Sequence, residues 1–355
     1  MYPKLVIDLN KVKNNLHKII DMVKGSGCSI MIVTKGYCAD MEIYKILEES
    51  NIDYLADSRI QNLRKYEGTK KERVLLRLPM NSEADEVVKY SDISLNSEIA
   101  TIRNLNEAAA KQNKVHKILL MIDLGDLREG IFFKNEDEIY RAVEEILKLK
   151  NIELFGLGVN LTCYGAVIPK KDNLSVLVEI AGKIENKYNI KLNMISGGNS
   201  SSVYLIEKKE LPEGINNLRV GEAFLLGDET AYSQMLEGFY DDVFTLDAEI
   251  IELKEKQSVP IGETGVDAFG GKPVYEDRGI IKRAILAVGR QDIDPDNLHP
   301  IDSKIDILGA SSDHLILDMS KSDKDYKVGD IVNFKLSYSS LLRAATSGYV
   351  EREYR

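Results

Sequence analysis

The sequence has few cysteines, no dense basic stretch and no long apolar run, and each absence excludes a class of protein. Its three cysteines, Cys28, Cys38 and Cys163, show no Cys-x-x-Cys spacing, so we expect neither a disulfide framework nor a metal site. Its 47 basic residues are outnumbered by 57 acidic ones, which argues against nucleic acid and membrane surfaces as partners. No run of about eighteen apolar residues and no secretory signal pattern occurs, so we expect a soluble cytoplasmic protein.

What the sequence does contain is an alternation of apolar runs with segments of helical period. After a first strand over residues 4–9 and a helix that Asn10 is expected to cap, the apolar runs are 29–34, 53–56, 74–78, 92–95, 117–122, 152–159, 192–196 and 215–220. Eight strands that alternate with helices predict an α/β fold, the parallel (β/α)8 TIM barrel. Beyond residue 235, strand-like runs follow one another without intervening helices, which predicts a C-terminal all-β domain. We therefore expect a barrel domain over 1–235 and a β domain over 236–355, with strand 4–9 belonging to either one.

Lys35 is the most informative single residue. It follows residues 29–34, a run of apolar and β-branched side chains typical of a buried strand, so its amine is expected at the mouth of a sheet. An amine in an apolar place can lose its proton and act as nucleophile and base, as lysines that form Schiff bases do. The alternative is a surface lysine at a strand end, which is the commoner place for a charged side chain.

Other predicted barrel strands also end in polar residues, and in an α/β barrel the chemistry collects at strand ends. These residues are Arg128 after the fifth strand, Asn160 after the sixth, Asn199 to Ser202 after the seventh, and Arg219, Gly221 and Glu222 at the eighth. The glycines and serines of the last two strands offer backbone N–H groups and hydroxyls, the chemistry of a phosphate site. The alternatives are a tight turn at Gly197-Gly198 and ordinary ion pairs for Arg128 and Arg219.

Together these motifs resemble the alanine racemase family, the fold-type III pyridoxal-phosphate enzymes. The resemblance rests on Lys35, Asp123-x-Gly-x-x-Arg128, the Asn199-Ser200 turn and Arg219-x-Gly221. Four stretches look like the ornithine racemase branch: Ala56-Asp-Ser-Arg-Ile-Gln-Asn62, Gly158-Val-Asn-Leu-Thr-Cys-Tyr-Gly165, Ser196-Gly-Gly-Asn-Ser-Ser-Ser202 and Gly309-Ala-Ser-Ser-Asp-His314. The resemblance covers essentially the whole chain, and the barrel followed by a β domain agrees with it.

The resemblance implies a pyridoxal 5'-phosphate cofactor and a role for each matching residue. Lys35 would bind the cofactor covalently and act as one catalytic base, while Arg219 would face the pyridine nitrogen. The phosphate would be held by Ser200, in the turn that Asn199 begins, and by the backbone of Gly221 and Glu222. The other implied contacts are Arg128 with the cofactor's phenolic oxygen or the substrate carboxylate, Tyr349 closing the site, and Ser312 and Asp313 meeting the substrate carboxylate from the partner subunit of a homodimer.

Two departures from the family pattern matter. Alanine racemases carry a histidine after strand six, where this chain has Asn160, so the contact to the cofactor must differ there. They also carry a Tyr-Gly in the β domain as the second base, where this chain reads Val259-Pro-Ile-Gly262-Glu-Thr-Gly265. Racemisation needs an acid or base on each face of the α-carbon, so either another residue replaces that tyrosine or Lys35 serves both faces. His314 is our first candidate because it adjoins the stretch expected to meet the substrate carboxylate and because histidine is a common general acid and base, with Asp267, Glu263 and Cys163 as the alternatives.

The expected function is therefore the interconversion of L- and D-ornithine. A cationic substrate side chain needs a carboxylate partner, and the candidates near the mouth are Glu222, Asp228, Glu229, Asp267 and Glu276. The alternatives are a racemase of alanine, serine or lysine, an aldolase or decarboxylase on the same scaffold, and a non-catalytic pyridoxal-phosphate carrier. The β domain argues against the carrier, because such carriers resemble the barrel alone.

Overall fold

The computed structural model describes residues 1–272 and 274–355, and the chain divides into two compact units. One, which we call the barrel unit, is Val12–Tyr240, and the other, which we call the β unit, joins Met1–Lys11 to Asp241–Arg355. The predicted boundary was 235/236, with strand 4–9 belonging to either domain; here the chain divides at 240/241. The first strand belongs to the β unit, because it pairs with strands from the far end of the chain. No helix in the described ranges is long and apolar enough to cross a membrane.

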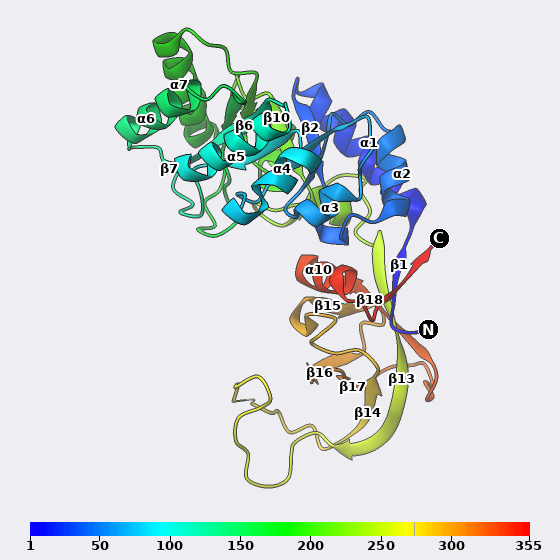
Figure 1. Cartoon of the computed structure of the whole chain (residues 1–355). Coiled ribbons are helices and arrows are strands. Elements are labelled where there is room, and N and C mark those ends of the chain that lie inside the picture. Colours follow the sequence, from blue (N-terminus) through cyan, green and yellow to red (C-terminus); the bar gives the residue numbers. More distant parts are fainter. Residues whose placement is uncertain (273) are drawn as a thin grey trace. The chain divides into compact units, whose positions relative to one another are not determined.

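The barrel unit is built on eight parallel strands with helices around them (Figure 1). The strands are β2 (Ser29–Val33), β3 (Tyr54–Asp57), β4 (Glu72–Leu75), β5 (Ile93–Asn96), β6 (His116–Asp123), β8 (Ile152–Gly158), β9 (Met194–Ser196) and β10 (Asn217–Val220). They pair in the order β5-β4-β3-β2-β10-β9-β8-β6, and β5 also pairs with β6, which closes the sheet. The predicted (β/α)8 barrel is therefore confirmed.

The helices of the barrel alternate with these strands in the chain, from α1 before β2 to α9 after β10. They are α1 (Leu9–Gly25), α2 (Met41–Glu49), α3 (Ile60–Arg64), α4 (Ala84–Tyr90), α5 (Ile99–Lys111), α6 (Glu136–Leu147), α7 (Lys171–Tyr188), α8 (Val203–Glu207) and α9 (Glu222–Leu226). Short pieces complete the unit: η1 (Lys35–Tyr37), η2 (Asn81–Glu83), η3 (Ser200–Ser202), β7 (Ile131–Phe132), β11 (Asp228–Glu229) and β12 (Gln234–Met235).

Helix α1 starts at Leu9, two residues earlier than a cap at Asn10 predicts. The carboxylate of Asp8 accepts the N–H groups of Asn10 and Lys11 at 3.0 and 3.1 Å, so Asp8 caps the helix and the expected cap, Asn10, is wrong. An N-cap carboxylate satisfies N–H groups that have no partner within the helix.

Apolar side chains from alternate strand positions fill the inside of the barrel. The cluster comprises Met31, Val33, Ala56, Val74, Ile93, Leu95, Leu119, Met121 and Met194. Strands β8 and β9 approach so closely that a Cβ on Gly156 would lie 1.8 Å from the carbonyl oxygen of Met194. Only glycine fits there, and this close pairing holds the ends of the two strands next to each other.

The β unit has an eight-stranded sheet and confirms the predicted C-terminal β domain. Its strands are β1 (Lys4–Ile7), β13 (Phe244–Gln257), β14 (Ile280–Leu286), β15 (Leu298–Pro300), β16 (Asp306–Ala310), β17 (Leu315–Asp318), β18 (Ile331–Leu336) and β19 (Glu351–Tyr354). The order is β15-β18-β13-β14-β17-β16, with β1 between β13 and β19. One helix, α10 (Tyr338–Thr346), and the turn η4 (Pro295–Asn297) are also present, although no helix was expected there.

Candidate active site

Lys35 stands at the carboxyl end of β2, between the ends of β3 and β10, which are the neighbours of β2 in the barrel. Its side chain is half-buried. The amine has no hydrogen bond or ion pair with any other residue that the structure describes. An amine that is partly removed from water and not engaged in an ion pair is available to react with a carbonyl group.

A buried carboxylate, Asp57, lies next to this lysine at the end of β3. It accepts the Thr34 hydroxyl at 2.6 Å, the Arg59 N–H at 2.8 Å and the Asn62 side-chain amide at 3.2 Å. Burial raises the pKa of Asp57, while its hydrogen bonds and the charge of Lys35 oppose that rise. No role was expected for Asp57, although it lies in the stretch 56–62 that resembles the ornithine racemase branch.

The ends of β9 and β10 bring the expected phosphate-binding residues together. The hydroxyl oxygen of Ser200 accepts the N–H groups of Gly221 and Ala223, each at 3.2 Å. Asn199 shapes the turn by accepting the N–H of Ser201 at 2.9 Å. The Ser201 hydroxyl is buried without a hydrogen-bond partner among the described residues. N–H groups that converge on one oxygen, beside an unused hydroxyl, suit a phosphate.

Arg219 of β10 is buried together with its charge. Its guanidinium donates to the Ser196 hydroxyl at 2.6 Å, to the Asn160 side-chain oxygen at 2.7 Å and to the Val159 carbonyl. Burial lowers the pKa of Arg219 to about 10, so the side chain stays charged at neutral pH. A fixed cation of this kind can face a ring nitrogen and keep it unprotonated.

The side chains of Arg128 and Asn160 both donate to Glu129, a residue for which no role was predicted. Arg128 Nη2 donates to Glu129 Oε1 at 2.6 Å, Arg128 Nε donates to Oε2, and the Asn160 amide donates to Oε1. Burial raises the pKa of Glu129, but the hydrogen bonds and charge of Arg128 outweigh burial and hold the pKa below its usual range. Glu129 is therefore anionic at neutral pH. The sequence held one signal for it, its place beside Arg128 in the segment 123–130.

Glu222 and Asp228 form an acidic pair near Lys35. Burial, followed by the charge of Asp228, raises the pKa of Glu222 to about 7, and Lys35 opposes this rise. Burial also raises the pKa of Asp228, whose Oδ1 is buried without a hydrogen-bond partner in the described part of the chain. The single amine of Lys35 cannot neutralise both half-buried carboxyl groups when they are ionised, so a second cation would be bound favourably beside them.

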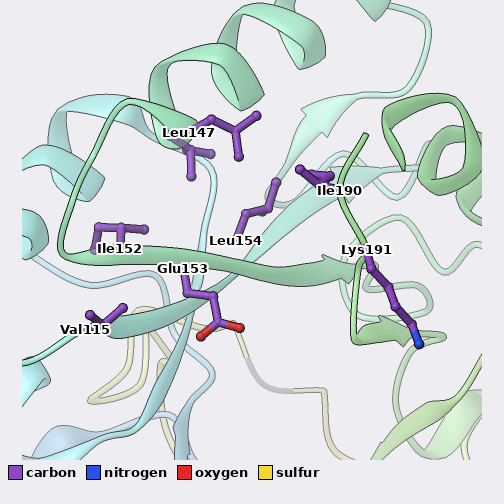
Figure 2. Close-up of a pocket in the computed structure, with 8 residues that line it drawn as sticks. Val115, Leu147, Ile152, Glu153, Leu154, Ile190 and Lys191 are labelled. Carbon is purple, nitrogen blue, oxygen red and sulfur yellow. The ribbon is translucent and has the colours of Figure 1, made fainter. Parts of the chain in front are cut away.

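A mainly apolar hollow lies near the amino ends of three barrel strands (Figure 2), and none of the residues described above lines it. Its volume is about 350 Å³, and it is lined by Val115, Ile146, Leu147, Ile152, Glu153, Leu154, Ile190 and Lys191. These residues precede or begin β6, β8 and β9, or end α6. Because active sites of such barrels form at the carboxyl ends of the strands, the hollow does not belong to the candidate site.

Comparison with known families agrees with this arrangement. The model of the family described as alanine racemase, N-terminal domain, matches residues 7–228, which is more than half of the chain. This chain belongs to the alanine racemase family.

Similar proteins cover the whole chain. The chain is 57% identical over 353 residues to an ornithine racemase from Acetoanaerobium sticklandii, covering 99% of each chain. It is 40% identical over 356 residues to a lysine racemase from Thermotoga maritima, covering 100% of this chain and 99% of the other. Among solved structures, an alanine racemase from Clostridium difficile 630 superposes with a TM-score of 0.74 at 19% identity, covering 100% and 96% of the two chains, which supports the fold alone.

Four of the predicted site residues lie in the β unit: Ser312, Asp313, His314 and Tyr349. His314 Nδ1 is 3.0 Å from Asp313 Oδ1, and the Ser312 hydroxyl donates to the same oxygen at 3.3 Å. These residues form the turn between β16 and β17. Tyr349 is 71% exposed, and its N–H donates to the Ser347 hydroxyl. The structure therefore groups Ser312, Asp313 and His314, while Tyr349 makes no hydrogen bond with them.

Proposed function

We propose that the protein is a pyridoxal-phosphate-dependent racemase that interconverts L- and D-ornithine. The observation that carries the proposal is the half-buried amine of Lys35, which has no ion pair among the described residues. It stands at the same strand ends as Ser200, on which the N–H groups of Gly221 and Ala223 converge, and as the buried Arg219. The substrate is proposed from the 57% identity to an ornithine racemase over nearly the whole chain. The 40% identity to a lysine racemase makes lysine, which also has a cationic side chain, the second candidate.

The residues at the strand ends fit the parts of pyridoxal 5'-phosphate. An amine suits its aldehyde, convergent N–H groups suit its phosphate, and a buried cation suits its ring nitrogen. When bound, the cofactor withdraws electrons from the substrate's α-carbon and so acidifies the α-proton. We assign the covalent link to Lys35, the phosphate to Asn199, Ser200, Gly221 and Glu222, the ring side to Asn160 and Arg219, the phenolic oxygen or substrate carboxylate to Arg128, and closure of the site to Tyr349.

Inversion of the α-carbon requires a proton donor and acceptor on each face. Lys35 is assigned to one face. We assign His314 to the other, because Asp313 holds its Nδ1 at 3.0 Å and so leaves Nε2 to exchange a proton. Asp267 is a poorer candidate, since its carboxylate accepts the N–H groups of Phe269 and Gly271 in its own turn.

The distal ammonium of ornithine is proposed to lie against Glu222 and Asp228. Of the five candidate carboxylates, Glu229 is occupied by the N–H groups of its hairpin and Glu276 is paired with Arg278. Asp267 is engaged in its own turn. Glu222 and Asp228 remain, and they form the acidic pair with raised pKa values near Lys35.

We further propose that the active form is a homodimer in the cytoplasm, in which Ser312, Asp313 and His314 of one chain meet the substrate in the barrel of the other. The long connection between β13 and β14 exposes large apolar side chains, with Ile261 90% and Val274 97% exposed. Exposed apolar side chains on such a connection favour its burial in an interface.

The cytoplasmic location is proposed from the cysteines. All three are unpaired, as in proteins of a reducing compartment.

A panel of amino acids tests the proposed activity. Purified protein supplied with the cofactor would be incubated with L-ornithine, L-lysine, L-alanine, L-serine and L-norvaline, and optical rotation followed. We expect ornithine to racemise fastest. Norvaline matches ornithine without the distal amine and should react at least about 100-fold more slowly, because it leaves a half-buried carboxylate unpaired. Equal rates for the two would refute the cationic side-chain site, and release of an aldehyde or of carbon dioxide without racemisation would identify an aldolase or a decarboxylase.

A further inference from the structure

The guanidinium of Arg128 is held along one edge only. Its Nε and Nη2 both donate to the carboxylate of Glu129, one to each oxygen. A guanidinium carries five N–H donors in one plane, so this pair leaves the edge formed by Nη1 and Nη2 with N–H groups to donate. No other side-chain hydrogen bond of Arg128 occurs in the described ranges 1–272 and 274–355.

Glu129 is itself fixed to the barrel wall. Its Oε1 accepts the side-chain amide of Asn160, whose Oδ1 accepts from Arg219 at 2.7 Å. Arg219 is 2% exposed and is held by Ser196 on its other side. A continuous series of hydrogen bonds therefore runs from the buried Arg219 to Arg128, which is 39% exposed at its side chain. A long side chain at such exposure would otherwise sample several rotamers.

We propose that Glu129 is a positioning residue that aims the free edge of Arg128 at the carboxylate of the amino-acid substrate, an inference that rests on the proposed racemase function. Bidentate pairing fixes the plane and the direction of a guanidinium together. Arg128 thus has two carboxylate partners on adjacent edges, a permanent one in Glu129 and a transient one in the substrate.

A positioning role and a simple charge effect predict opposite changes in the affinity for an anion when Glu129 is replaced. If Glu129 only adds negative charge, its removal strengthens the binding of an anion, because a like charge has been taken away. If Glu129 orients Arg128, its removal weakens the binding of an anion, because the guanidinium is no longer held in one orientation. The Glu129→Gln and Glu129→Asp variants differ usefully, since the second keeps the charge but shortens the reach.

The probe is 5-aminopentanoate, which keeps the carboxylate and distal amine of ornithine and lacks the α-amine. Its affinity for the holoenzyme would be measured by calorimetry, with 1,4-diaminobutane as the probe that lacks a carboxylate. We expect Glu129→Gln and Glu129→Asp each to weaken 5-aminopentanoate about tenfold, the scale of one charge-assisted hydrogen bond, and to leave 1,4-diaminobutane within about twofold of wild type. The matched control is Glu145→Gln, which breaks an exposed 2.6 Å pair with Arg103 on the outer helices and should change neither affinity.

The experiment distinguishes a failure of the positioning role of Glu129 from a failure of the proposed racemase function. Tighter or unchanged binding of 5-aminopentanoate by Glu129→Gln, with a melting temperature near that of wild type, would overturn the positioning role even if the wild type racemises ornithine. If the wild type does not racemise ornithine, the proposed function fails while the carboxylate probe still tests Glu129. Should Glu129→Gln not fold, Glu129→Asp decides, because unchanged binding there would show that charge alone matters.

Discussion

Replacing Glu222 with glutamine should stabilise the cofactor-free protein at alkaline pH, although the residue lies in the proposed active site. Folding raises the pKa of Glu222 from 4.5 to about 7. As pH rises between these values, the unfolded chain releases the proton first, so the folded state loses stability, and the loss is complete above about pH 7. A pKa difference of about 2.5, at about 1.4 kcal/mol per pKa unit, amounts to about 3 kcal/mol. Glutamine keeps the shape of the side chain and removes this loss.

The assay is urea unfolding of wild type and Glu222→Gln at two pH values, followed by far-ultraviolet circular dichroism. The variant should be more stable than wild type by about 0.4 kcal/mol at pH 4.5 and by about 3 kcal/mol at pH 8. The control is Glu213→Gln, at an exposed position of the same unit. An equal difference at the two pH values, or a less stable variant at pH 8, would refute the reasoning and indicate that Glu222 is held ionised by Lys35.

Three further predictions follow from other residues. Borohydride should fix the cofactor covalently to the wild type and abolish its visible absorption band. The Lys35→Ala variant should show neither fixation nor racemisation. Fixation in that variant would disprove the assignment of the covalent link to Lys35. Mixing inactive Lys35→Ala with inactive His314→Ala should restore up to about half of the activity per dimer, since one of two symmetric sites is intact; no recovery after verified subunit exchange would place the site within one chain. Gly156→Ala should destabilise the barrel by about 3 kcal/mol or more in urea unfolding, because its Cβ would lie 1.8 Å from Met194 O; Gly182→Ala, in α7 with open space around it, is the control and should not destabilise.

The barrel could be predicted because its signal is local. Each apolar run is a strand buried on both faces, and such runs stand out in the sequence without knowledge of their partners. Strand bounds were less accurate: β4 is Glu72–Leu75, whereas the apolar run 74–78 was expected, because Glu72 and Arg73 are only partly buried and are polar. Helix α10 was missed, since its sequence, Tyr338–Thr346, buries only one narrow face.

The parts of the site that were not predicted depend on contacts between distant segments. Glu129 is defined by Asn160, 31 residues away, and Asp57 by the hydroxyl of Thr34, 23 residues away. The local signals, the place of Glu129 beside Arg128 and of Asp57 in the stretch 56–62, do not show that either carboxylate is held inside the site. Lys35 and Arg219 could be proposed because a charged residue at the end of or inside an apolar strand is unusual by itself.

The pairing of β1 has a consequence for synthesis on the ribosome. Lys4 lies opposite Asp247 and Glu351, so this strand is made first and its two neighbours emerge 243 and 347 residues later. At about 5–20 residues per second, the first of them follows after roughly 12 to 50 seconds. The whole of Val12–Tyr240 leaves the ribosome within that interval, so the nascent barrel can close while β1 still has an unpaired edge. The four-residue length of β1 limits the edge that could pair with another nascent chain during the wait.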